Sequence, residues 1–292
     1  MPLHNKNHMI NVLILNWNSS ESTLKLIKSI SNTTYKAFRI ILIDNNSNTP
    51  DKKKIIQIYE EYQYIFDMHL ILNTENYGYA EGNNRGYEYL VLNNLEGDLL
   101  ILNPDVIISS NTFKVMFNNL QNDVGGVMSR TISSDKSKIL YDFIKLKGFM
   151  QKYETSNDKI CQTDYLAGSC MLLNRILIDE IGLFDKNFFM YWEDVELSLR
   201  IKRSGFKIIS TTETSIYRSE NDPSRSENAI YYSSRNAFSL FRRYNYFELF
   251  DLIYYQVHLF FACSKVVFID RKIRVFGYLY SGVLSGIKNS TN

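Results

Sequence analysis

The chain has 292 residues, of which 45% are hydrophobic and 22% are charged. This share of apolar side chains is enough for a sizeable core and excludes a wholly disordered chain. The net charge of +2 conceals an uneven distribution, because residues 1–200 carry −4 and residues 201–292 carry +6. An acidic body followed by a basic C-terminal part indicates a surface for an anionic partner.

The sequence lacks the usual marks of export, a disulfide framework or a membrane span. Its three cysteines, Cys161, Cys170 and Cys263, form no CxxC pair, which disfavours a disulfide framework or a zinc site and indicates a reducing compartment. The N-terminal apolar run Ile10–Leu15 is too short for a signal peptide. The charge-free stretch Leu252–Ser264 has 13 residues, fewer than the roughly 18–20 that a spanning helix needs. We therefore expect a cytoplasmic protein without a membrane-spanning helix.

The first hundred residues alternate between short apolar runs and segments with helical spacing. Strands are predicted at Asn11–Leu15, Arg39–Ile43, His69–Leu72 and Asp98–Leu102. Between them, helices are predicted from Ser20 onward, over 52–64 and over 80–92. Short units of strand and helix in alternation predict an α/β fold with a parallel sheet and right-handed crossovers.

Each of these four strands is followed by a polar cluster rich in Asn and Asp. The clusters are Asn16–Asn18, Asp44–Ser47, Asn73–Gly78 and Asn103–Asp105. In open α/β sheets the ligand binds beyond the carboxyl ends of the strands. Asn and Asp are ordinary turn formers, so one such cluster means little, but four in register predict a single polar crevice.

The second half of the chain is less regular. Residues 130–162 are polar and lack a clear period, so we expect a surface excursion there. Residues Glu193–Ser204 predict a helix that ends at Gly205, followed by a strand at Lys207–Ser210. From Ala229 onward the sequence is aromatic and predicted to be largely helical.

Asp105 is the first candidate for chemistry. A carboxylate just past a buried strand, in the turn Asn103–Asp105, is well placed for a hard divalent cation such as Mg²⁺, whose shell substrate phosphates complete. The alternative is a type I turn that caps the next helix, near Ser109.

Asp44 is the second candidate, because a carboxylate at the end of the second strand commonly binds the polar edge of a nucleotide. The alternative is an Asx turn. No GxGxxG follows the first strand and no GxxxxGK[ST] loop occurs, which disfavours nicotinamide chemistry and P-loop hydrolysis.

The third candidate is the acidic pair Glu193 and Asp194 at the start of a predicted helix. The helix dipole favours the ionised form there, which suits a general base. The alternative is charge complementarity at a helix N-terminus without a catalytic role. Lone histidines form no recognisable catalytic pattern, and Arg-rich base-reading motifs are missing, so we expect no nucleic-acid partner.

Taken in order, several segments resemble the inverting nucleotide-sugar glycosyltransferases of family 2, which have the GT-A fold, and most closely their bacterial rhamnosyltransferase-like branch. The segments are Leu15–Ser19 (LNWNS), Ile41–Ser47 (ILIDNNS), Asn73–Gly86 (NTENYGYAEGNNRG), Ile101–Val106 (ILNPDV), Leu166–Arg175 (LAGSCMLLNR), Ile181–Ile208 and Tyr231–Tyr244 (YYSSRNAFSLFRRY). Together they cover roughly residues 10–245, which is far more specific than any single motif.

The resemblance implies a GT-A domain over residues 1–245, which is Rossmann-like with a mostly parallel central sheet flanked by helices, and a helical C-terminal extension over 246–292. It also implies a role for each of several residues. These are Trp17 and Asp44 for the nucleotide base, Asn76, Gly78 and Asn84 for the ribose and diphosphate, Asp105 for a divalent cation (Mg²⁺ or Mn²⁺), Asp194 as catalytic base, and Glu193 and Trp192 beside the acceptor.

Two positions depart from the family pattern. Asn103 stands where the family's DxD motif has its first Asp, a departure common in this branch that removes one charge but leaves the residue on the donor side. Arg218 stands where many relatives have a His near the metal. Because Arg cannot ligate a metal but pairs well with phosphate, we expect Arg218 to compensate the charge of the donor diphosphate.

The function implied by the resemblance is inverting transfer of a sugar, with rhamnose a candidate, from a nucleotide-diphosphate donor to a glycan acceptor. The acceptor would be linked to polyprenyl diphosphate, in the synthesis of a bacterial surface polysaccharide such as O-antigen or capsule. Asn103 and Arg218 leave an alternative, a catalytically silent nucleotide-sugar-binding or membrane-peripheral assembly subunit.

The C-terminal extension mixes aromatic and basic residues over 246–288. Interfacial helices use aromatics in the headgroup layer and cations toward anionic lipid, which predicts peripheral contact with the cytoplasmic membrane face. The alternative is that these aromatics cover the core of the catalytic domain or form a dimer interface.

Overall fold

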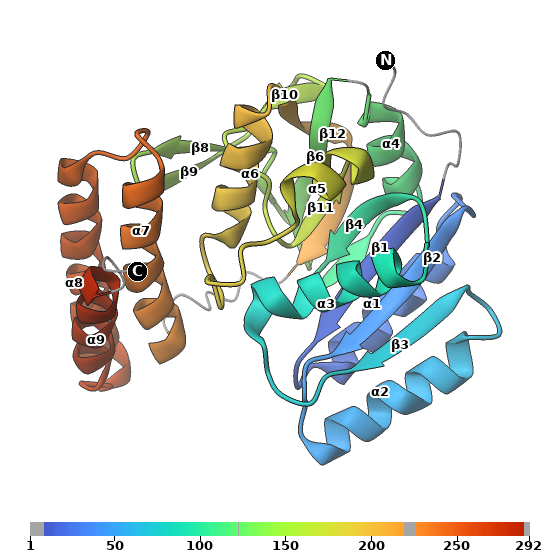
Figure 1. Cartoon of the computed structure of the whole chain (residues 1–292), viewed down its shortest axis with the longest axis horizontal. Coiled ribbons are helices and arrows are strands. Elements are labelled where there is room, and N and C mark those ends of the chain that lie inside the picture. The colour runs from blue at the N-terminus through green and yellow to red at the C-terminus, as the bar shows by residue number, and fades with distance from the viewer. Residues whose placement is uncertain (1–8, 122, 219–225, 289–292) are drawn as a thin grey trace.

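The computed structural model describes residues 9–121, 123–218 and 226–288. A central mixed sheet carries helices on both faces, and three C-terminal helices form a bundle beside it (Figure 1). The fold is α/β, as predicted.

The N-terminal half confirms the predicted alternation of strand and helix. Its elements are β1 (Ile10–Asn16), α1 (Ser20–Ser31), β2 (Phe38–Asp44), α2 (Thr49–Tyr62), β3 (Met68–Leu72), α3 (Gly78–Leu92) and β4 (Asp98–Leu102). Strand β1 pairs in parallel with both β2 and β4, and β2 pairs in parallel with β3. The carboxyl ends of these strands therefore meet at one edge, where Asn16 lies beside Asp44.

The second half extends the same sheet with mixed pairing. Its main elements are β5 (Val106–Ile108), α4 (Thr112–Asn119), β6 (Val124–Ser133), β11 (Cys170–Leu173), α5 (Arg175–Ile181), α6 (Glu193–Arg203) and β12 (Lys207–Arg218). The sheet order is β10-β12-β6-β11-β4-β1-β2-β3, in which β11 is antiparallel to both neighbours and β12 is parallel to β6. The predicted helix at 193–204 is confirmed, with Gly205 after it at φ +85°.

Residues 130–162 are not the irregular excursion that we expected. They complete β6 and form β7 (Ile139–Tyr141), β8 (Phe143–Lys147), β9 (Met150–Glu154) and β10 (Ile160–Gln162). Ile144 and Leu146 point inward and Lys145 and Lys147 outward, which is the period of a half-buried strand. The signal was missed because each strand is only three to five residues long, and the outer faces of β8 and β9 carry Lys and Gln side chains.

Two hydrophobic clusters hold the sheet between its helices. Val12 and Ile14 of β1 belong to the cluster that also contains residues of α1, α2 and α4. Leu13 points to the opposite face, into a cluster with residues of α3, α5, α6 and the C-terminal helices. This alternation along one strand shows that the sheet is buried on both faces, as its continuous apolar run predicted.

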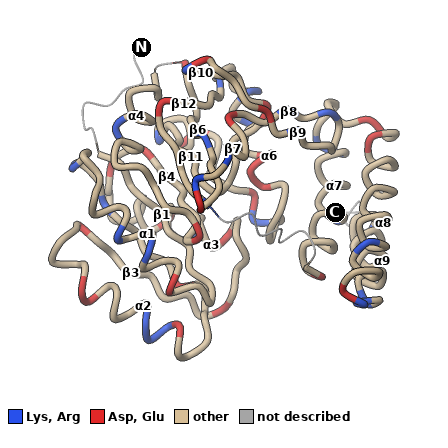
Figure 2. The backbone as a smooth tube through the Cα atoms, turned by 180° about the vertical axis from the view of Figure 1, so that it is seen from behind, with Lys and Arg blue, Asp and Glu red and all other residues tan. Residues whose placement is uncertain are grey.

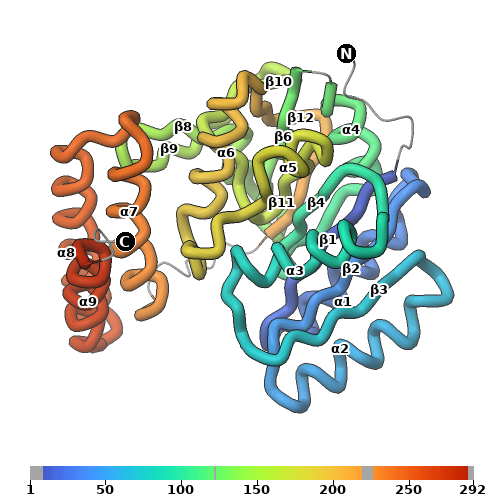
Figure 3. Tube along the Cα trace, in the orientation of Figure 1, coloured from blue at the N-terminus to red at the C-terminus, as the bar shows by residue number. Residues whose placement is uncertain are grey.

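The C-terminal bundle consists of α7 (Glu227–Arg243), α8 (Leu249–Asp270) and α9 (Val275–Lys288). Figure 3 shows the three helices standing side by side at one end of the molecule. Close packing of α9 on α7 needs small residues, since a Cβ at Gly282 would lie 2.7 Å from the carbonyl oxygen of Tyr231. The helical region thus begins at Glu227, ahead of the boundary at 245/246, which stays a prediction.

Within the described residues, one helix, α8, is long enough and apolar enough to cross a membrane, judged by its length and composition. The apolar segment is thus longer than the charge-free stretch Leu252–Ser264, because the helix continues past Lys265. The expectation that no helix crosses a membrane stays a prediction, since length and composition alone meet this criterion. Only 22% of its apolar window is buried within the protein.

Candidate active site

The acidic pair Glu193 and Asp194 opens helix α6 after an unusual turn. Tyr191 and Trp192 both adopt left-handed backbone conformations, at φ 67° and 73°. Such residues are strained and persist only where the surroundings hold them. Here Asn236 of α7 donates its side-chain amide to the carbonyl oxygens of Met190 and Tyr191, at 2.9 and 2.8 Å. The turn that aims the carboxyl groups is therefore held by the C-terminal bundle.

Asp194 combines burial with specific hydrogen bonds. Its Oδ2 accepts from the backbone N–H of Gly168 at 3.1 Å, and its Oδ1 accepts from the N–H of Val195 at 2.8 Å. Burial raises the pKa of Asp194 to about 6, against the lowering effect of these backbone donors. A carboxylate that is ionised at neutral pH and still basic is suited to accept a proton from a hydroxyl.

Glu193 lies beside it in a drier position. The residue is 6% exposed, and no described group forms a hydrogen bond with its Oε2. Burial, together with the negative charge of Asp194, holds the pKa of Glu193 well above its ordinary value. The two neighbouring carboxyl groups therefore differ in surroundings, since Asp194 accepts two backbone hydrogen bonds and Oε2 of Glu193 has no partner among the described groups.

Trp192 supports this pair from the protein interior. Its ring lies edge-to-face against Phe149 and Tyr255, with centroids 5.4 Å away in each case. Its indole N–H donates to the carbonyl oxygen of Ser233 at 3.1 Å. A side chain that is 5% exposed offers little surface to an acceptor, and the acceptor-side role of Trp192 stays a prediction.

Tyr79 is a site residue that the sequence did not single out. Its hydroxyl donates to the carbonyl oxygen of Gly168 at 2.6 Å, and Gly168 in turn donates to Asp194. Burial first, and then the negative charges of Glu193, Asp194 and Asp105, hold the pKa of Tyr79 well above its ordinary value. The Tyr79 hydroxyl is thus affected by the charges of the predicted base and of the predicted metal ligand. That these two residues act in one site stays a prediction.

Gly78 places Tyr79 there by allowing a close backbone approach. It has φ +77°, and a Cβ at this position would lie 2.3 Å from the carbonyl oxygen of Phe189. The next N–H, that of Tyr79, donates to the same oxygen at 2.6 Å. Asn76 accepts from the Gly78 N–H at 2.9 Å and fixes the turn. The signal in the sequence was the position of Tyr79 directly after this polar cluster.

Asn84 ties α3 to the segment before the acidic pair. Its amide donates to the carbonyl oxygen of Phe184 at 2.8 Å and accepts from the N–H of Phe184 at 3.0 Å. Asn76 also accepts from the amide of Asn45 at 2.9 Å. Asn76, Gly78 and Asn84 thus have structural roles in the loops of the site, and their contacts with ribose and diphosphate stay predictions.

Asp44 lies inside a hydrogen-bonded turn. Its side chain has no exposed surface, and it accepts from the amide of Asn16 at 3.1 Å and from the N–H of Ser47 at 3.2 Å. Lys52 lies 3.9 Å away. These contacts support the turn-stabilising alternative, and the contact of Asp44 with the base stays a prediction. Trp17, at the same sheet edge, is 52% exposed and available for stacking.

Asp105 and Arg218 come together although 113 residues separate them. Strand β5 pairs with β12, and Arg218 Nη2 lies 3.5 Å from Asp105 Oδ2. In the turn after Asn103, the N–H of Val106 donates to the carbonyl oxygen of Asn103 at 3.4 Å. The turn leads into β5 and does not cap a helix. The half-exposed Asp105 side chain stays open toward solvent.

The donor set fits a hard divalent cation shared with a substrate. Within residues 9–121, 123–218 and 226–288, no group of three or more His, Cys, Asp and Glu side chains forms a closed metal cage. A Mg²⁺-like cation is often held by one or two carboxylates and by substrate phosphates, which Asp105 and a diphosphate would supply. Arg218 beside it carries a fixed positive charge for the same phosphates.

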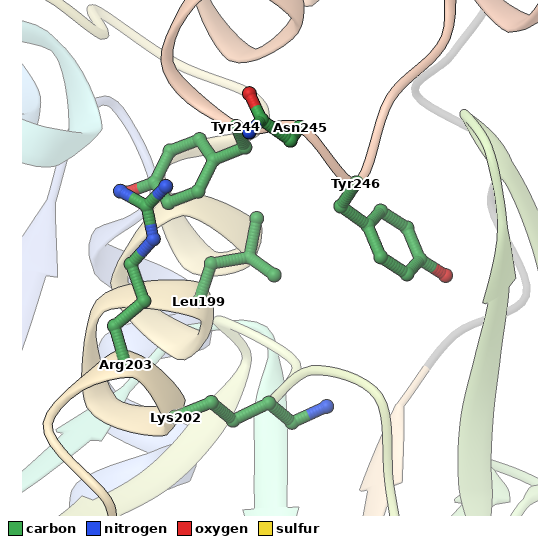
Figure 4. Close-up of a pocket in the computed structure, with 6 residues that line it drawn as sticks. All are labelled: Leu199, Lys202, Arg203, Tyr244, Asn245 and Tyr246. Atoms are coloured by element: carbon green, nitrogen blue, oxygen red, sulfur yellow. The ribbon is translucent and has the colours of Figure 1, made fainter.

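A surface hollow of about 300 Å³ lies at the other end of α6, lined by Leu199, Lys202, Arg203, Tyr244, Asn245 and Tyr246 (Figure 4). At about 1.5 Å per residue, Arg203 lies roughly 13 Å along the helix axis from Asp194. Its cations are already engaged, since Lys202 donates to the Asp164 carbonyl oxygen at 2.7 Å and Arg203 lies 4.3 Å from the centroid of the Tyr244 ring. We therefore place the active site at the N-terminal end of α6 and not in this hollow.

Among proteins of known function, the chain is similar to three glycosyltransferases. It is 23% identical to the low-salt glycan biosynthesis hexosyltransferase Agl10 of Haloferax volcanii, over 97% of this chain and 92% of that protein. It is 24% identical to the rhamnosyltransferase WbbL of Escherichia coli, over 68% of this chain and 79% of that protein. A stretch of 42 residues, 14% of each chain, is 43% identical to the N-acetylglucosaminyl-diphospho-decaprenol L-rhamnosyltransferase of Mycobacterium tuberculosis.

Solved structures share the GT-A fold. TarS 1–349 of S. aureus in complex with UDP-GlcNAc superposes with a TM-score of 0.65 at 13% identity, over 96% of this chain and 81% of that one. The mannosyltransferase PcManGT of Pyrobaculum calidifontis, in complex with GDP-Man and Mn²⁺, superposes with a TM-score of 0.63 at 12% identity, over 96% and 87%.

The family model described as glycosyl transferase family 2 matches residues 11–182, which include β1 to β4 and their polar strand ends. The resemblance of the sequence and the mixed sheet with helices on both faces agree with this match. The chain belongs to glycosyl transferase family 2 and is a glycosyltransferase of the rhamnosyltransferase-like kind.

Proposed function

We propose that this glycosyltransferase transfers a sugar with inversion from a nucleotide-diphosphate donor to a hydroxyl group of a glycan, with Asp194 as the catalytic base. One observation carries the proposal. Asp194 is buried, accepts hydrogen bonds from the N–H groups of Gly168 and Val195, and has a pKa raised to about 6. This arrangement supports one ionised, basic carboxylate at neutral pH, as a single displacement requires.

The reaction balances with one base. The Asp194 carboxylate accepts the proton of the acceptor hydroxyl while that oxygen attacks the anomeric carbon. The new bond forms on the face opposite the diphosphate, the bond from the anomeric carbon to the phosphate oxygen breaks, and the nucleoside diphosphate leaves with the electron pair. The anomeric configuration is thereby inverted. Glu193 is buried, and its raised pKa disfavours the charged form that a second nucleophile would need.

Asp105 is the residue that would hold a divalent cation, Mg²⁺ or Mn²⁺, on the donor side. When bound, such a cation neutralises the charge that develops on the leaving diphosphate. Arg218, 3.5 Å from Asp105, would pair with the same diphosphate directly. Asn103 closes the turn that presents Asp105, consistent with a donor-side position.

For the substrates, we propose a rhamnose-type donor and an acceptor linked to polyprenyl diphosphate. The names of the similar proteins support this, because two are rhamnosyltransferases and one of these acts on a diphospho-decaprenol acceptor. A product of this kind belongs to surface polysaccharide synthesis, such as O-antigen or capsule. We further propose a cytoplasmic protein in peripheral contact with the inner membrane face, where such an acceptor is displayed.

The test combines nucleotide binding with transfer. Thermal stability is measured with dTDP, UDP and GDP, each with and without Mn²⁺, and transfer is then measured with the corresponding sugar donors for the wild type, Asp194→Asn and Asp67→Asn. Asp67 is a matched control, a partly exposed carboxylate at the β3 edge of the sheet. We expect Asp194→Asn to lose roughly 10²–10⁴ in rate and Asp67→Asn to keep the wild-type rate. Nucleotide binding without transfer from any donor would instead favour the silent subunit.

A further inference from the structure

One side of helix α8 exposes an unusual run of apolar side chains. Phe250, Ile253, Val257, Phe260, Phe261 and Phe268 are 47–90% exposed. Their spacing of mostly three or four residues puts them along one stripe of the helix. A contiguous apolar stripe of this length is rare on a soluble monomer and marks an interaction surface.

The opposite side of α8 already has a partner. Leu252, Tyr255, Leu259, Cys263 and Val266 are buried and belong to the same hydrophobic cluster as residues of α6 and α9. The core-covering role that the sequence left open is therefore filled by this inner side. The outer stripe needs a separate explanation.

Positive charge gathers at the end of this stripe. Lys265, Arg271, Lys272 and Arg274 are all exposed at the end of α8 and in the turn to α9. None of the four forms an ion pair with a residue in the described parts of the chain, and one acidic residue, Asp270, lies among them. Figure 2 shows blue segments at this end of the two helices, next to one red segment.

The combination favours lipid over a second copy of the chain. In the described segments α8 carries acidic side chains at Asp251 and Asp270 alone, and α9 carries none, so the surface offers little to complement its own cations. Aromatic side chains sit well at the boundary between headgroups and acyl chains, and Lys and Arg are attracted to anionic headgroups. Both groups lie on the same pair of helices here.

We propose that α8 lies in the plane of an anionic phospholipid surface, with Phe250, Phe261 and Phe268 in the interfacial layer and the α8–α9 turn against the headgroups. The helix lies on the membrane rather than crossing it, because its inner side already packs in one hydrophobic cluster with α9. On the same side, Tyr255 contacts Trp192. The proposal deepens the proposed function, since it names the surface that would bring the site to a lipid-linked acceptor.

The same helix connects the membrane face to the catalytic pair. Tyr255, on the inner side of α8, contacts Trp192, and Trp192 immediately precedes Glu193 and Asp194. On α7, Tyr232 stacks on Phe189 with centroids 4.8 Å apart, next to the Gly78 turn. These contacts hold the active site at a fixed position relative to the outer stripe of α8.

Vesicle flotation of the full-length protein tests the proposal. The vesicles are phosphatidylcholine with or without phosphatidylglycerol, at low and high salt. The variants are Phe250→Gln/Phe261→Gln/Phe268→Gln and Arg271→Gln/Lys272→Gln/Arg274→Gln. A matched control, Tyr64→Gln/Leu92→Gln, replaces two exposed apolar residues of the sheet domain, which are 88% and 81% exposed.

We expect the wild type and the control to float with anionic vesicles, more weakly at high salt, and the aromatic variant to stay unbound. Loss of three cations should lower the affinity by roughly two orders of magnitude. Equal flotation of all variants would overturn the proposal. So would sedimentation without lipid that shows a concentration-dependent dimer of the wild type and no dimer of the aromatic variant. Asp194→Asn should float like the wild type, and the aromatic variant should keep transfer to a water-soluble acceptor, so failure here is distinct from failure of the proposed catalytic role.

Discussion

The hydroxyl of Tyr79 donates to the carbonyl oxygen of Gly168 at 2.6 Å. The N–H of the same Gly168 donates to Oδ2 of Asp194 at 3.1 Å. Tyr79 therefore holds the residue that supplies a hydrogen bond to the proposed base, and its own hydroxyl bonds to Gly168 rather than to Asp194. This makes Tyr79 a positioning residue whose effect should be visible in the titration of Asp194.

Replacement of Tyr79 by Phe removes the hydroxyl but keeps the ring against Phe184. Gly168 then loses one of its two fixed contacts, its N–H bonds Asp194 less well, and the pKa of Asp194 rises further, because that bond favours the charged form. We expect the acidic limb of the pH–rate profile to move to higher pH. A uniformly lower rate with an unmoved limb would show a merely structural role.

The pH dependence of the wild-type enzyme follows from Asp194 itself. The base must be ionised, so the transfer rate should rise with pH through the region of its pKa, about 6, and level off above it. The measurement is kcat against pH with saturating donor and acceptor. A rate that stays constant from pH 5 to 8 would contradict the assignment, because this interval contains the pKa of about 6.

The same raised pKa has a consequence for stability. A carboxyl group whose folded pKa exceeds its unfolded value stabilises the fold fully below the unfolded value, and this contribution is lost as the pH rises through the folded pKa. At pH 8 the wild type therefore bears the cost of a buried charge, which Asp194→Asn lacks. We expect this variant to have a higher Tm than the wild type at pH 8, with the difference shrinking toward pH 4.

Arg218 can be tested against the metal. We expect Arg218→Ala to raise the KM for the donor and to require more Mn²⁺, because the diphosphate loses a fixed cation beside Asp105. Arg218→His should restore part of the rate at high Mn²⁺, since a neutral imidazole can ligate the cation. An unchanged rate and metal dependence in both variants would show that Arg218 does not act on the donor.

Tyr255 connects the C-terminal bundle to the catalytic pair and should be costly to remove. Tyr255→Ala leaves a cavity against Trp192 and Phe149, which we expect to destabilise the protein by about 3–5 kcal/mol, the range for a buried aromatic. Urea unfolding measures this value, with Tyr254→Ala, a half-exposed neighbour, as the control. For the same reason, a truncation near residue 245 removes packing from the active site as well as the proposed membrane face.

The sequence predicted the sheet and the acidic pair well because both rest on local signals. The strand runs at 11–15 and 39–43 are continuously apolar, and the pair at 193–194 opens a helix with a clear end at Gly205. It did not predict the strands within 130–162, because each is only three to five residues long. One of them, β10, also pairs with a partner far along the chain, β12. Tyr79 was missed for a related reason, since its bond to Gly168 spans 89 residues.

For the site residues, the sequence predicted roles through the resemblance, but it did not predict how deeply each side chain is buried. The roles of Asp105 and Asp194 come from the resemblance and stay predictions, and the negative charges of both residues contribute to the raised pKa of Tyr79. The burial of Asp44 and Trp192 was not predictable, because it depends on which neighbours fold over them. Asp44 is covered through Asn16 and Ser47, and Trp192 through Phe149 and Tyr255.

The two bonds from Asn236 to the carbonyl oxygens of Met190 and Tyr191 have a practical consequence for protein engineering. The loop around Asn103, which we propose to face the donor, follows strand β4, whereas Asn236 bonds the segment before α6. We therefore expect an exchange of that loop between relatives to leave the anchor in place. An exchange of the C-terminal helices has no such freedom. A chimera keeps the left-handed turn at 191–192 in place only when its new seventh helix supplies an amide at the position of Asn236.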